Sequence, residues 1–97
     1  MSEYRFRLRG EVDIATAPRV RADFHALIAH DSSNLLIDCS QLDFIDSTGI
    51  VVLLEANRDL EADGRHMLLV NVPEGPRRVF EILALTNLFC SDRELVS

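Results

Sequence analysis

Two short apolar runs constrain the fold of this chain more than any other feature. They are "LLIDC" at 35–39 and "HMLLVNV" at 66–72. Continuous apolar runs of this length, bounded by polar residues, are typical of strands buried on both faces, as in a parallel sheet. Between them, a helical segment is predicted from about Ser47 to Ala62, ended by "DG" at 63–64.

A third strand is predicted at 4–9, where "YRFRLR" alternates apolar residues with arginine. This period of two is that of a half-buried strand, with Tyr4, Phe6 and Leu8 facing a core and the arginines facing water. Gly10, in the "GEVD" that closes the strand, supplies a permissive backbone position.

Two further helices complete the pattern. Thr16 is a candidate cap, Pro18 suits a first turn, and an apolar face follows at helical spacing: Ala17, Val20, Phe24, Leu27 and Ile28. "PEGP" at 73–76 opens another helix, whose apolar surface is predicted on Val79, Phe80, Ile82 and Leu83. The tail at 87–97 is predicted to add a short strand and little else.

The resulting order is β-α-β-α-β-α, and it predicts a single α/β domain over residues 1–97. We expect a mixed, mostly parallel sheet with helices packed on it.

The composition excludes several functions. A net charge of −6 argues against a nucleic-acid or anionic-membrane surface. With no long apolar run and no hydrophobic signal core, we expect a cytoplasmic protein without membrane insertion. Cys39 and Cys90 are expected to be free thiols. His25, His30 and His66 have no metal-binding spacing, so no metal site is expected.

The stretch "DFIDSTGIVVLL" at 43–54 sets polar residues directly before apolar ones. Asp46 is a good N-cap for the predicted helix, with Ser47 at its first position. In the simplest interpretation Asp46 caps and nothing else happens. Val51 and Val52 weaken that interpretation, because a helix that buries Ile50, Leu53 and Leu54 turns these two β-branched residues partly elsewhere.

Two explanations of the valines remain open. Either a second layer covers them, or they form an exposed apolar patch that suits a protein partner. A hydroxyl beside such a patch suits a phosphorylation switch, since a helix N-terminus accommodates phosphate. Asp13, Asp43 and Asp46 would add like charges nearby, so we expect phosphate to disrupt docking without unfolding the domain.

The same residues carry a resemblance to a known family. The element order, "GEVD" at 10–13, Asp38 trailing its strand, "LDFIDSTG" at 42–49 and "RRVFEILALTNLF" at 77–89 resemble the STAS domain. The likeness is to the bacterial anti-sigma factor antagonists and covers nearly the whole chain.

The resemblance implies a function based on binding, without catalysis. In that family a serine-kinase anti-sigma factor binds the dephosphorylated antagonist, releases a sigma factor, and phosphorylates the first hydroxyl after the motif aspartate; a phosphatase resets the switch. Carried over, the acceptor is Ser47 beside Asp46, with Thr48 a minor alternative. Asp13 matches the family's other acidic position, and Gly49 completes the D-S-T-G motif. Nucleotide would be bound by the kinase, so this chain needs no cofactor.

The chain departs from the family pattern at two points. Members usually carry another strand before "YRFRLRGEVD", so we expect either a missing edge strand or a shortened variant. Val51 stands where a small or polar residue is common, which affects partner choice. The sequence leaves homodimer formation open.

Three other functions fit the sequence less well. A STAS assembly subunit that is not phosphorylated, in a lipid-transport ATPase complex or a stress-signalling scaffold, is the main alternative, but it has no need of a hydroxyl at Ser47. An aspartic protease is contradicted by the extra residue between Asp46 and Gly49 and by the βα alternation. A serine hydrolase is disfavoured because Ser47 lies outside a G-x-S-x-G motif.

Overall fold

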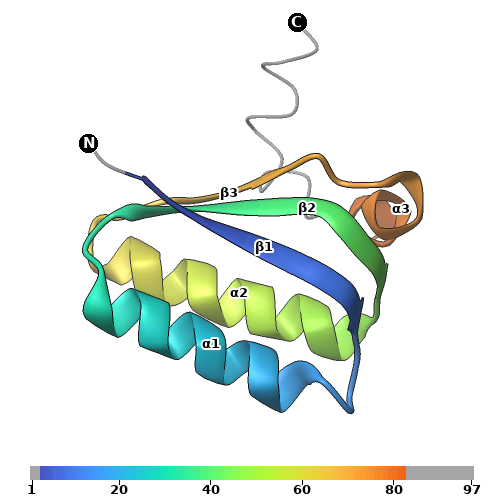
Figure 1. The fold of residues 1–97 in the computed structure, drawn as a ribbon, viewed down its shortest axis with the longest axis horizontal. Helices are drawn as coiled ribbons and strands as arrows, with labels where there is room; N and C mark the ends of the chain where they lie inside the picture. Colours follow the sequence, from blue (N-terminus) through green and yellow to red (C-terminus); the bar gives the residue numbers. More distant parts are fainter. Residues whose placement is uncertain (1–2, 83–97) are drawn as a thin grey trace, which may run out of the picture.

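The computed structural model describes residues 3–82 (Figure 1). Strands and helices alternate, as the sequence predicts. The elements are β1 (Glu3–Val12), α1 (Ala17–His30), β2 (Asn34–Ile45), α2 (Ser47–Ala62), β3 (Met67–Val70) and α3 (Glu74–Ile82). The predicted tail strand and Leu83 lie outside the described residues.

The sheet has the order β1-β2-β3, and both neighbouring pairs are parallel. This confirms the predicted α/β class and mostly parallel sheet, and the antiparallel component of a mixed sheet is not seen in residues 3–82. β2 is central, which explains why "LLIDC" is apolar almost throughout. Within the described part of the chain, β1 forms one edge of the sheet.

Helices α1 and α2 lie side by side against one face of the sheet, and α3 packs beside β2 (Figure 1). Phe6 of β1 meets Phe24 of α1 with ring centroids 5.1 Å apart. The largest fully buried side chains come from both the sheet and the helices: Phe24, Phe80, Ile37, Leu42, Ile45, Leu53, Leu60 and Leu69. This packing fixes the ends of β1 and β2 relative to α2.

Strand β2 has two irregularities that the sequence did not predict. The register against β1 shifts between Arg7 and Arg9 and again between Gly10 and Glu11. At each shift β2 contributes one residue more than β1, as in a β-bulge. The second shift lies at Asp43 and leaves both Asp43 and Phe44 exposed, although strict alternation would bury one of them.

Gly10 has a φ of 69°, which confirms the predicted permissive position. Several other predicted details are wrong. Strand β1 does not close at Gly10 but continues to Val12. Tyr4 is 40% exposed because it lies on the edge strand, where no further element of residues 3–82 covers it. Ile82 is 75% exposed, so the apolar face of α3 within the described residues consists of Pro76, Phe80 and the half-buried Val79.

No helix within residues 3–82 is both long enough and apolar enough to span a membrane.

Candidate functional site

The candidate site lies where β1 and β2 end, at the same edge of the sheet. Val12 and Ile45 are register partners, and each is the last residue of its strand. The backbone N–H of Asp46 donates to the carbonyl of Val12 at 3.2 Å. Asp13 and Asp46 therefore leave neighbouring strands at the carboxyl edge, where open α/β sheets usually place their sites.

Asp46 caps α2, as predicted. Its side-chain Oδ1 accepts from the backbone N–H of Gly49 at 3.1 Å, and its carbonyl accepts from the N–H of Ile50 at 3.0 Å. The bond to Gly49 satisfies one of the free N–H groups of the first turn. Ser47 follows as the first helical residue and is exposed.

Gly49 has a packing role that the motif alone did not reveal. A Cβ at this position would stand 2.7 Å from the Val12 carbonyl oxygen and 2.7 Å from Cγ1 of Ile45. Both atoms belong to the ends of the paired strands. Only a glycine lets the first turn of α2 approach the strand ends this closely. Gly49 therefore determines how far Ser47 stands from the strand ends.

Asp13 closes the turn before α1. Its Oδ1 accepts from the backbone N–H groups of Ala15 at 3.0 Å and Thr16 at 3.1 Å. Thr16 is the N-cap by position but makes no side-chain capping bond; its Oγ1 accepts from the N–H of Asp13 at 3.0 Å and donates to the Glu11 carbonyl at 2.9 Å. Asp13 is thus held rigidly beside the start of α2.

The two valines have different environments, which corrects the predicted patch. Val51 is 46% exposed, but Val52 is 1% exposed and belongs to the core. Successive helical residues are about 100° apart, so one of the pair faces the sheet when the other faces outward. Val52 is therefore no part of a docking surface. Leu54, predicted to be buried, is 36% exposed.

One line of exposed residues runs along α2 from the candidate acceptor. Ser47, Val51, Leu54 and Arg58 are all exposed and follow one another at intervals of three or four residues. At that spacing they share one face of the helix. We call these four residues the α2 stripe. Thr48, half buried, lies off this line.

Two exposed apolar side chains near the same strand ends were missed from the sequence. Ile14, in the turn after β1, is 76% exposed, and Phe44, beside the second bulge of β2, is 49% exposed. Their exposure could not be predicted from the sequence, because residues in a turn or beside a bulge do not follow the regular alternation of a strand. Both add apolar surface at the edge that carries Asp13 and Asp46.

A second charged cluster lies within the sheet, apart from this edge. Asp38 of β2 is 5% exposed, 3.5 Å from Nη2 of Arg5 and 3.9 Å from Nε of Arg7. Its Oδ1 accepts from the Ser40 N–H at 3.0 Å and from Nδ2 of Asn71 at 3.3 Å. The Ser40 backbone bond, with help from the Ser40 side chain, Asn71 and Arg5, lowers the pKa of Asp38 from its usual 3.8 to about 2 despite burial. This cluster ties the three strands together.

The described residues gather no set of three or more histidine, cysteine or carboxylate side chains that could hold a metal ion. Cys39 is fully buried, and Cys90 lies outside the described residues. The site as built offers a hydroxyl, two fixed carboxylates and an apolar surface.

Comparisons with known proteins agree on one family. The STAS domain model matches residues 4–95. An anti-sigma F factor antagonist from Lysinibacillus sphaericus is 32% identical over 80 residues, which cover 81% of this chain and 68% of that protein. An anti-sigma-B factor antagonist from Listeria monocytogenes is 29% identical over 79 residues, covering 81% and 69%.

The fold also matches solved structures of the anti-sigma factor antagonist SpoIIAA. The unphosphorylated form gives a TM-score of 0.78 at 27% identity, over 90% of this chain and 76% of that chain. The phosphorylated form, from Bacillus, gives 0.70 at 27% identity, over 90% and 79%.

Proposed function

Since this chain belongs to the STAS domain family, we propose that it is an anti-sigma factor antagonist whose docking is switched by phosphorylation of Ser47. It acts by reversible binding to a serine-kinase anti-sigma factor, which releases a sigma factor. A phosphatase returns Ser47 to the hydroxyl form. The relatives' names and the existence of phosphorylated and unphosphorylated SpoIIAA structures support this assignment.

The placement of Ser47 carries the proposal. Ser47 is exposed at the first position of α2, in line with the exposed Val51 and Leu54. A partner that rests on these two apolar side chains covers the Ser47 hydroxyl as well. An acceptor within the docking surface couples modification directly to binding.

The electrostatics of the site favour release after phosphorylation. Phosphate adds a charge of about −1.5 to −2 at neutral pH. The N-terminus of α2 accommodates this charge within the domain, because the helix dipole is positive there. The partner, in contrast, meets the phosphate together with Asp13 and Asp46, which the turn and the cap hold in place. The domain keeps its fold while the interface loses complementarity.

Intact mass after incubation with ATP and the serine-kinase anti-sigma factor of the same genome tests the acceptor. We expect a gain of one phosphate that Ser47→Ala abolishes. Thr48→Ala, which removes the neighbouring hydroxyl, and Ser40→Ala, which removes another exposed serine, should keep the gain.

Two outcomes would contradict the proposal. Phosphate retained in Ser47→Ala would place the acceptor elsewhere in the chain. A wild-type protein that neither binds the kinase nor gains phosphate would instead be an assembly subunit that is not phosphorylated.

A further inference from the structure

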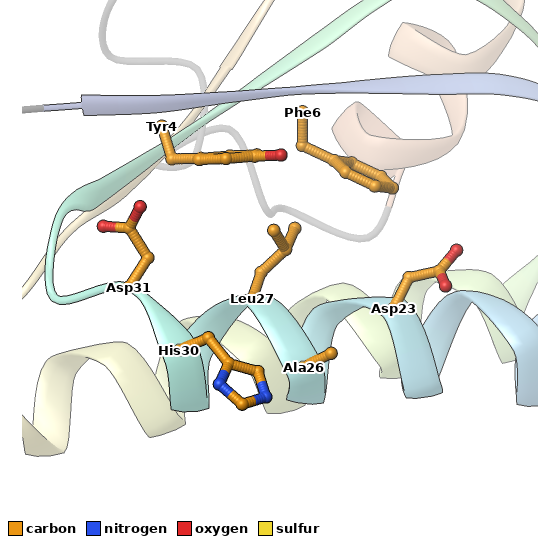
Figure 2. Close-up of a pocket in the computed structure, with 7 residues that line it drawn as sticks. All are labelled: Tyr4, Phe6, Asp23, Ala26, Leu27, His30 and Asp31. Atoms are coloured by element: carbon orange, nitrogen blue, oxygen red, sulfur yellow. The ribbon is translucent and has the colours of Figure 1, made fainter.

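No strand within residues 3–82 pairs with the outer side of β1, which we call the free edge of β1. This edge borders a cleft that the proposed switch does not use. The cleft, of about 580 Å³, is lined by Tyr4, Phe6, Asp23, Ala26, Leu27, His30 and Asp31. Figure 2 shows Tyr4 and Phe6 descending from β1 toward Leu27 of α1, with Asp23 and Asp31 on either side. The cleft lies between the sheet edge and α1, on the helix-covered face of the sheet.

The opposite face of the same strand carries a row of positive charge. Arg5, Arg7 and Arg9 alternate with Phe6 and Leu8, which point toward the helices, so the arginines point away from them. Arg5 and Arg7 keep 56% and 48% of their side chains exposed although both lie near Asp38. The edge therefore has an arginine row above it and, below it, a cleft whose centre is apolar and whose sides carry Asp23 and Asp31.

These two features specify the strand that could pair with β1. Side chains of an added strand alternate between the faces of the sheet, so every second one would enter the cleft and the others would stand beside the arginines. Apolar side chains fit the positions that enter the cleft, between Phe6 and Leu27. Carboxylates fit the positions beside the arginines, since opposite charges on neighbouring strands are favourable.

We propose that the free edge of β1 binds an extended partner segment in which acidic and apolar residues alternate, by adding it to the sheet as a fourth strand. The binding surface consists of the arginine row Arg5, Arg7 and Arg9 and the cleft over Ala26 and Leu27. A second copy of β1 fits poorly, because antiparallel pairing of two β1 strands centred on Arg7 sets arginine beside arginine. The arginine row thus opposes self-pairing and selects an acidic strand.

Titration of the isotope-labelled protein with the peptide acetyl-VEVEVEV-amide, followed by two-dimensional NMR, tests this surface. We expect saturable shifts concentrated in residues 3–9 and around Ala26 and Leu27. Acetyl-VKVKVKV-amide reverses the charge, and acetyl-VEPEVEV-amide keeps the charge but removes a ladder donor. Both should bind at least about fivefold more weakly.

Protein variants separate the two halves of the surface. Arg9→Glu reverses one charge of the row and should weaken binding about fivefold, whereas Arg78→Glu, the same change at an exposed position of α3, should leave it unaltered. Ala26→Trp fills the cleft from an exposed helix position and should also weaken binding. Circular dichroism of each variant checks that it is folded.

Four results would overturn the proposal. The first is the absence of saturable shifts, and the second is equal binding of the glutamate and lysine peptides. The third is a dimer in sedimentation whose contact is β1 and which excludes the peptide, since a second copy would then be the occupant. The fourth is slow hydrogen exchange of the β1 edge amides in the protein alone, since another part of the chain would then fill the edge.

Discussion

At the residue scale, Gly49 shows how a motif position can be set by packing. Its Cα–H faces the Val12 carbonyl and the Ile45 side chain, and a methyl group would stand 2.7 Å from both. We predict that Gly49→Ala lowers the free energy of unfolding by about 2–3 kcal/mol, because overpacking must displace backbone at a strand end. Urea denaturation measures the change.

Gly75→Ala is the matched control for this prediction. Nothing lies within 4 Å of a Cβ at Gly75, in α3, so we expect a change within about 0.5 kcal/mol. Equal losses in the two variants would mean that Gly49 has no special role in packing α2 against the strand ends.

Asp38 makes a pH-dependent contribution at the same scale. The hydrogen bond from the Ser40 N–H is the largest cause that lowers the pKa of Asp38 from 3.8 to about 2. A lowered pKa means that the folded protein favours the carboxylate, so this stability is fully present above about pH 4 and is lost as the pH falls toward 2. Asp38→Asn should cost about 1–2 kcal/mol at pH 7.

Unfolding free energies of wild type and Asp38→Asn between pH 2 and 7 test this. The difference between the two proteins should shrink as the pH falls below about 4. A difference that stays constant down to pH 2 would show that the Asp38 charge does not contribute.

At the element scale, the sequence predicted helices better than strands. The bounds of α2 match because local signals mark both ends: Asp46 caps the start, and Gly64, with φ of 73°, ends it. The bulges of β2 and the extension of β1 depend on pairing between distant residues, which has no local signal. Thr16 is the N-cap of α1 by position, as predicted, but its hydroxyl bonds to the turn before the helix and makes no capping bond.

Arg65 joins the C-terminal ends of α1 and α2 in a way that the sequence did not reveal. Its guanidinium, 8% exposed, donates to the Ile28 carbonyl at 3.0 Å and to the Asp31 carbonyl, and its Nε lies 2.9 Å from Oδ2 of Asp63. It therefore caps the C-terminus of α1 from the loop between α2 and β3. This contact spans 34 residues of sequence, so no local pattern predicts it.

We predict that Arg65→Gln lowers the free energy of unfolding by about 2 kcal/mol, because carbonyls at the end of α1 lose charged donors. Hydrogen exchange should accelerate most in the last turn of α1. Arg58→Gln, on the exposed face of α2, should change stability by no more than about 0.5 kcal/mol. An unchanged exchange rate in α1 would rule out the capping role.

At the scale of the whole molecule, the proposed partner surface is the α2 stripe with the neighbouring strand ends. Val51→Asp places a charge on the exposed part of the stripe, so we expect it to weaken binding of the anti-sigma factor about tenfold or more and to leave the fold intact. Ile82→Asp is the control, since Ile82 is also an exposed apolar residue but lies on α3.

Binding affinities from calorimetry decide this prediction. Similar losses in Val51→Asp and Ile82→Asp would point to a general effect of charge, and no loss in Val51→Asp would place the interface elsewhere. The sequence predicted that Val51 and Val52 are both exposed. Val51 is exposed but Val52 is buried, because apolar character alone does not reveal which side of a helix the sheet covers.

In the proposed switch, a phosphate on Ser47 controls docking without altering the fold. The most direct measurement compares the dissociation constants of unmodified and Ser47-phosphorylated protein for the serine-kinase anti-sigma factor, with the melting temperature of each form alone. We predict binding of the unmodified form, about hundredfold weaker binding of the phosphorylated form, and similar melting temperatures. Equal dissociation constants, or loss of binding together with unfolding of the domain, would contradict the proposed switch.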